Sequence, residues 1–289
     1  MKGLQLLILF AILSLLSCTL KTKDAKEEKT PLELFYGMSD WYAHNETYSD
    51  SVLDGRKGLL HREFLTDWYH LGDSIIFPLS LGIYVDENYP TEKIRNVILA
   101  RLDSMIREDF EYDISIPAPM DLSKVNHVND YLAYWQKMFD KLKATFSSRD
   151  SWSSFSEITG TRMCAVAHQV AVSDNWVTYL FESSVDYHTS CGWTSHADYI
   201  TLNTETGKAL SLDELLQIHP VANIHDTVRD AYEKAVKEKT GEDWKNEDIT
   251  GELLLEVANG AAIINEGLLI YYHPYNAPQA EGQYNIIVN

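Results

Sequence analysis

The sequence predicts an α+β fold, in which amphipathic helices pack against antiparallel sheets and two subdomains associate closely. Two long strand-like runs, 161–173 and 176–187, flank Asp174-Asn175, a pair typical of hairpin turns. Upstream, apolar residues recur at helical spacing over 122–146, and short strand-like runs end the chain. We expect the hairpin and the C-terminal strands to share one antiparallel sheet, packed by that helix.

The elements of the first half follow from local patterns. Apolar residues alternate over 79–85, which predicts a strand after a break at Pro78. Pro90-Thr91 is a typical helix start, and a stripe of apolar residues at helical spacing follows it: Ile94, Val97, Ile98, Leu102, Met105 and Ile106. The stripe of the 122–146 helix, which Asp121 or Ser123 could cap, contains Val125, Val128, Leu132, Trp135, Met138, Phe139 and Leu142. Core packing is the favoured interpretation of this stripe, and a ligand surface is the alternative.

The second half contains clearer start and stop signals. Gly207 lies in a turn that needs a positive φ, and Ser211 with Glu214 three residues later forms a capping box at the start of a short helix. The remaining pattern predicts helices over 224–239 and 252–257, and strands over 261–264, 268–272 and 284–288.

The charge balance restricts the classes of partner. The chain of 289 residues has 24 Lys and Arg against 43 Asp and Glu, a net charge of −19, and loss of Lys2 with a leader would make it −20. Such an excess repels phosphate backbones and anionic headgroups, so we expect no nucleic-acid partner and favour a cationic one. The alternative is that the acidic surface only keeps the protein soluble.

The N-terminus indicates where the protein resides. After Lys2, an apolar run from Leu4 to Leu16 is too short to span a bilayer, so residues 1–17 are predicted to be a signal peptide. The following Cys18 completes an ending that resembles the lipobox of bacterial lipoproteins, which implies lipidation of Cys18 and a lipid-anchored cell-envelope protein. An ordinary secretory signal is the alternative. Residues 18–31 are charged and aperiodic, as expected of a flexible tether.

The other cysteines and several histidines are candidates for a disulfide and a metal site. Outside the cytoplasm Cys164 and Cys191 could form a disulfide, or each could be a buried apolar residue. A metal site could in principle use His168, His188, His196 and His273 with Asp186 and Asp198. Their spacing matches none of the common zinc patterns, so we predict no metal and no cofactor.

Two stretches near the C-terminus, residues 202–216 and 267–282, resemble the C-terminal domain of the RsiV/PdaC-type extracytoplasmic proteins. The resemblance divides the chain into an N-terminal α/β subdomain, 32–195, and a C-terminal α+β subdomain, 196–289. In that family one such domain recognises lysozyme as the ectodomain of an anti-sigma factor, and another accompanies a peptidoglycan deacetylase. The resemblance therefore implies an envelope protein that binds lysozyme, another basic protein or a cell-wall component.

We expect binding through the loops around Tyr187–His196 and His273–Gly282. The contact candidates are Trp193, His196, His273 and Tyr275, because loop aromatics offer large contact areas at little entropic cost. Trp193 and Tyr275 could instead fold back over the core. No catalytic motif is present, so we predict no enzymatic activity. The alternative is an exported, carboxylate-dependent glycan hydrolase or cell-wall-modifying enzyme.

Overall fold

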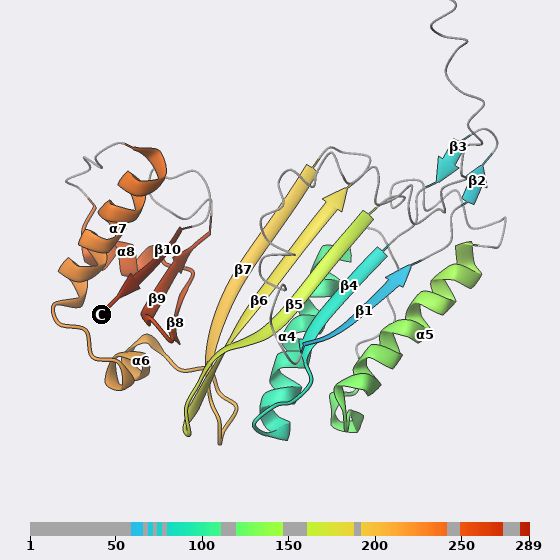
Figure 1. The fold of residues 1–289 in the computed structure, drawn as a ribbon, viewed down its shortest axis with the longest axis horizontal. Helices are drawn as coiled ribbons and strands as arrows, with labels where there is room; N and C mark the ends of the chain where they lie inside the picture. Colours follow the sequence, from blue (N-terminus) through green and yellow to red (C-terminus); the bar gives the residue numbers. More distant parts are fainter. Residues whose placement is uncertain are drawn as a thin grey trace, which may run out of the picture. The chain divides into compact units, whose positions relative to one another are not determined.

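Three β-sheets, of five, three and two strands, are present in the described part of the chain (Figure 1). The computed structural model describes residues 59–65, 69–71, 74–76, 80–110, 120–146, 161–187, 192–241, 249–273 and 284–289. All of them belong to one unit of the chain, Val52–Asn289. No helix in these ranges has the length and apolar character needed to cross a membrane. The described residues form both α-helices and largely antiparallel sheets, which confirms the predicted α+β class.

The five-stranded sheet has the order β1-β4-β5-β6-β7. Its strands are β1 (Leu59–Leu65), β4 (Ser80–Asp86), β5 (Thr161–Val172), β6 (Trp176–Tyr187) and β7 (Gly192–Asn203). The predicted hairpin is confirmed as β5 and β6, and the Ser173 N–H donates to Trp176 O across its turn at 2.8 Å. The small sheet pairs β2 (Tyr69–Leu71) with β3 (Ser74–Ile76).

One pair in the large sheet, β4 with β5, is parallel, whereas its other pairs are antiparallel. A parallel pair needs a crossover connection, and here the connection contains α4 (Glu92–Phe110) and α5 (Val128–Phe146). Both helices pack their apolar stripes onto the sheet. The resulting core includes Leu81, Ile83, Val85, Ile94, Ile98, Leu102, Tyr131, Trp135, Phe139, Met163, Ala165 and Ala167. The core role predicted for the 122–146 stripe is therefore confirmed.

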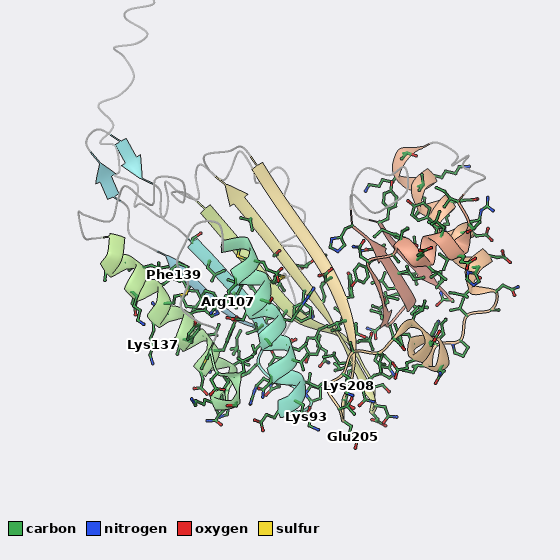
Figure 2. The ribbon with its side chains drawn as sticks, turned by 180° about the vertical axis from the view of Figure 1, so that it is seen from behind. Lys93, Arg107, Lys137, Phe139, Glu205 and Lys208 are labelled. Atoms are coloured by element: carbon green, nitrogen blue, oxygen red, sulfur yellow. The ribbon has the colours of Figure 1, made fainter. Side chains whose placement is uncertain are left out.

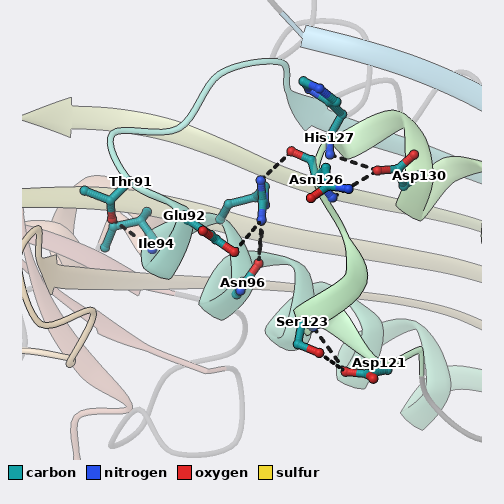
Figure 3. A network of polar contacts seen from close by, with 10 residues as sticks. Thr91, Glu92, Ile94, Asn96, Asp121, Ser123, Asn126, His127 and Asp130 are labelled. Carbon is teal, nitrogen blue, oxygen red and sulfur yellow. Dashed lines mark hydrogen bonds and ion pairs between the residues drawn. The ribbon is translucent and has the colours of Figure 1, made fainter.

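The helix expected over 122–146 is interrupted near its start. A short 3-10 helix, η2 (Leu122–Lys124), is capped by the Asp121 side chain, and α5 begins only at Val128. Between them the Asp130 carboxylate accepts from the N–H groups of Asn126 and His127, both at 3.0 Å (Figure 3). These two hydrogen bonds, His127 first, hold the pKa of Asp130 below its ordinary value. The carboxylate thus stabilises a helix start that apolar spacing alone does not reveal.

The C-terminal region has its own sheet and core. Its elements are α6 (Leu212–Ile218), α7 (Ile224–Thr240), α8 (Gly251–Val257), β8 (Gly260–Ile264), β9 (Gly267–Tyr272) and β10 (Tyr284–Val288). The predicted capping box of Ser211 and Glu214 is present, and Gly207 has the expected positive φ, 71°. A second buried cluster contains Leu215, Val228, Tyr232, Leu254, Ile270, Tyr272, Tyr284 and Ile286.

The prediction of one sheet shared by the hairpin and the C-terminal strands is wrong. The place beside β6 is taken by β7, and β8, β9 and β10 form a separate sheet of order β10-β9-β8. The physical reason is that this second sheet buries its apolar residues against side chains of α7 and α8 in a core of its own. The subdomain boundary proposed at residue 196 falls inside β7, whose pairing with β6 runs from Gly192 to Asn203.

The turn after β7 is held against the start of α4. Lys93 lies close to Glu205 (Figure 2), and its Nζ donates to Glu205 O at 3.1 Å. The Thr91 hydroxyl donates to Thr204 O at 3.4 Å. Gly207 lies against Lys93, where an added Cβ would be 3.4 Å from the Lys93 Cβ. These contacts fix the point at which the chain leaves the five-stranded sheet and enters the C-terminal region.

Candidate functional site

A groove of about 430 Å³ lies between β7 and the C-terminal elements. Most of its lining is apolar, and the described lining residues are Arg101, Phe181, Asp198, Tyr199, Ile200, Thr201, Leu210, Leu212, Leu215, Leu255, Ala258, Gly260, Ala261, Ile270 and Tyr271. This volume and character are typical of sites that take up a small ligand or a side chain of a partner. We refer to it below as the groove.

Hydrogen bonds between the two sheets fix the walls of the groove. The Ile263 N–H donates to Thr201 Oγ1 at 3.0 Å, and the Thr201 hydroxyl is also 2.8 Å from the Thr178 hydroxyl. The Tyr271 hydroxyl donates to Tyr199 O at 3.1 Å. Burial, followed by the nearby Asp198 carboxylate, raises the pKa of Tyr271 to about 12, so this hydroxyl keeps its proton at neutral pH.

A cluster of three charged or titratable side chains, Arg101, Asp198 and His273, lies at the groove, and we call it the rim cluster. Asp198 Oδ2 is 2.8 Å from Arg101 Nη2, and Asp198 Oδ1 is 2.8 Å from His273 Nε2. Because a carboxylate only accepts hydrogen bonds, His273 Nε2 carries the hydrogen in this contact. The exposed fractions of the three side chains are 53% for Arg101, 28% for Asp198 and 23% for His273.

The helical wall of the groove is acidic on its outer side. Helix α6 supplies Leu212 and Leu215 to the lining, and α8 supplies Leu255. The two helices contain no Lys or Arg, and their exposed carboxylates are Asp213, Glu214, Glu252 and Glu256. A largely apolar groove with the Asp198 carboxylate in its lining, on a chain of net charge −19, favours an apolar group carried by a cationic molecule.

The structure brings together two residues that the sequence had singled out for different reasons. The sequence makes His273 a candidate for contact with a partner, and it makes Asp198 a candidate metal ligand. The two side chains form one hydrogen bond, although they lie 75 positions apart in the chain. Sequence reasoning missed Arg101. It lies 97 positions from Asp198, so no local spacing could have linked the two residues.

The other predicted site residues are only partly described. The backbones of Trp193 and His196 lie in β7, opposite Asp186 and Ser183 of β6. The side chains of Trp193 and His196 lie outside the described part of the structure, as do Tyr275, His188 and the lipidation residue Cys18. Contact through these residues stays a prediction.

The candidate metal ligands that the structure describes belong to two separate ion pairs. His168 Nδ1 is 3.1 Å from Asp86 Oδ1 on β4, whereas His273 contacts Asp198 on β7. Among the described residues, no group of three His, Cys, Asp or Glu side chains could hold a metal ion. Cys164 is half-buried on β5, and Cys191 lies outside the described residues, so the disulfide stays a prediction.

Comparisons with known proteins find distantly similar solved structures, with TM-scores below 0.5. No protein-family model and no curated protein matches the sequence. One similar solved structure is a DUF3298 family protein from Pseudomonas aeruginosa PAO1, with 16% identity, a TM-score of 0.44, and coverage of 80% of this chain and 88% of the other. Another is a DUF3298 family member from Bacteroides fragilis, with 12% identity, a TM-score of 0.41, and coverage of 80% and 90%.

Proposed function

We propose that this protein is a lipid-anchored cell-envelope protein that binds a basic protein, for which lysozyme is the model partner. The N-terminal sequence supports the anchor, and the resemblance to RsiV/PdaC-type domains supports binding as the activity. The net charge of −19 favours a cationic partner, because long-range attraction raises the rate of encounter.

The observation that carries this proposal is the groove, whose lining combines many apolar side chains with the Asp198 carboxylate. The apolar side chains in the lining would pack against an inserted side chain, and buried anchors of this kind provide much of the binding energy at protein interfaces. The negative charge of the chain, −19, would attract cationic residues around that side chain. Central apolar anchors surrounded by complementary charges are the usual arrangement of a specific interface.

Filling the groove should weaken binding. In Ala258→Trp a large ring replaces a lining methyl group, and we expect the affinity for lysozyme to fall at least about tenfold, as for the loss of one anchor residue. The matched control is Ala222→Trp, which adds the same ring at an exposed position between α6 and α7. Isothermal titration calorimetry at two salt concentrations measures both variants, and circular dichroism checks that each is folded.

Two outcomes would contradict the proposed binding function. Equal affinity of lysozyme for Ala258→Trp and Ala222→Trp would place the contact elsewhere on the molecule. Hydrolysis of peptidoglycan by the purified protein, abolished by Asp198→Asn, would favour the glycan-hydrolase alternative.

The lipid anchor has a separate test. Cys18→Ser removes the thiol that accepts the acyl chains, so the variant should move from the membrane fraction to the soluble fraction after cell lysis. Cys164→Ser is the control and should stay with the membranes. Incorporation of labelled fatty acid into Cys18→Ser would show that the anchor is wrongly assigned.

A further inference from the structure

We infer that Asp198 is the subsite for a guanidinium or ammonium group of the partner, and that Arg101 occupies this subsite in the unbound protein. The inference rests on the proposed function and adds the residue and the chemistry of recognition to it. The partner segment would place an apolar side chain in the groove and an adjacent Arg or Lys on Asp198.

The two oxygens of Asp198 are held in different ways. The Oδ1 atom accepts from His273, which directly follows β9 and whose backbone N–H donates to Asn259 Oδ1 at 2.6 Å. His273 is thus anchored by backbone and side chain at the end of a sheet. Within the described residues, the hydrogen-bond partner of the Oδ2 atom is a long side chain that reaches over from α4, that of Arg101. One oxygen is therefore fixed in orientation, and the other can exchange its partner.

Arg101 can leave Asp198 at little cost. Its side chain is 53% exposed, and within the described residues its one hydrogen-bond partner is Asp198. Exposed ion pairs contribute little to stability, because solvent screens them and ordering a long side chain costs entropy. A departing guanidinium would be solvated immediately, so the exchange needs no change in the backbone.

The chemistry of the incoming group follows from the group that it replaces. The Asp198 oxygen already accepts from a guanidinium nitrogen at 2.8 Å, at a place that also lines the apolar groove. An Arg or Lys of the partner would restore this charge-assisted hydrogen bond, whereas a carboxylate would be repelled by Asp198. The subsite therefore selects for a cation beside an apolar residue.

The inference makes the unusual prediction that removing a surface arginine strengthens binding of a cation. The probes are N-acetyl-leucyl-arginine amide and N-acetyl-leucyl-glutamine amide, titrated into the full chain and followed by NMR. Arg101→Gln should bind the arginine probe about three- to fivefold more tightly than the wild type, since no internal cation competes. Its affinity for the glutamine probe should be unchanged.

Two controls separate the subsite from general electrostatics. Lys234→Gln removes the same charge from an exposed position on α7 and should leave the affinity for the arginine probe unchanged. Asp198→Asn keeps the shape of the side chain and should abolish the preference for the arginine probe over the glutamine probe.

The outcomes distinguish this inference from the proposed function. Unchanged or weaker binding of the arginine probe by Arg101→Gln, an equal gain in Lys234→Gln, or binding of neither probe would overturn the inference. In those cases the proposed function would still stand if the protein binds lysozyme and Ala258→Trp weakens that binding. If lysozyme fails to bind but the probes behave as expected, the subsite stands and the choice of lysozyme as model partner fails.

Discussion

Replacement of Trp135 by alanine is expected to lower the free energy of unfolding by about 3–5 kcal/mol. Trp135 is fully buried between α5 and the sheet. Its ring makes edge-to-face contacts with Tyr131 and Tyr134, at centroid distances of 6.4 Å and 5.9 Å. Alanine would leave a large cavity among residues that cannot close it, and a urea titration measures the loss.

The matched variant is Trp135→Phe. Phenylalanine keeps an aromatic ring at this buried position and loses only part of the volume of the indole. We expect a loss of about 1–2 kcal/mol, as for a moderate change of shape in a packed core. A loss below about 1 kcal/mol for Trp135→Ala would mean that the residue does not pack in the core.

Replacement of Arg107 by leucine is expected to cost about 3 kcal/mol. Arg107 is labelled in Figure 2. Its Nε donates to Asp103 Oδ2, its Nη2 donates to Tyr134 Oη at 2.7 Å, and its guanidinium lies 5.7 Å from the centroid of the Trp135 ring. The side chains of Arg107 and Asp103 are only 16% and 7% exposed. Leucine would leave a buried carboxylate without its counter-charge, which is far more costly than losing a surface ion pair.

Helix α7 offers a matched control. Arg229 and Glu233 form an ion pair of the same i,i+4 spacing, at 3.1 Å, with exposed fractions of 38% and 40%. Arg229→Leu should cost less than about 1 kcal/mol in the same denaturant titration. Equal losses for the two variants would show that burial of the Asp103 pair is unimportant. The double variant Asp103→Leu with Arg107→Leu should recover part of the loss, because no unpaired charge is left in the core.

The sequence by itself determined the local elements and the charge. The hairpin turn at Asp174-Asn175, the capping box of Ser211 and Glu214, and the positive φ of Gly207 depend on residues at most four positions apart. The apolar stripe containing Trp135 depends on helical periodicity, which is also local. Such signals depend on neighbouring residues and not on tertiary contacts, so short segments of the sequence are enough to predict them.

The tertiary structure alone decided which strands pair and which side chains meet. The choice of a parallel partner for β4, and the separation of β8, β9 and β10 into their own sheet, depend on which apolar faces can be buried together. The rim cluster joins Asp198 to residues 97 and 75 positions away. Pairing over such separations is selected by the packing of the whole fold, because local patterns carry no information about a distant partner.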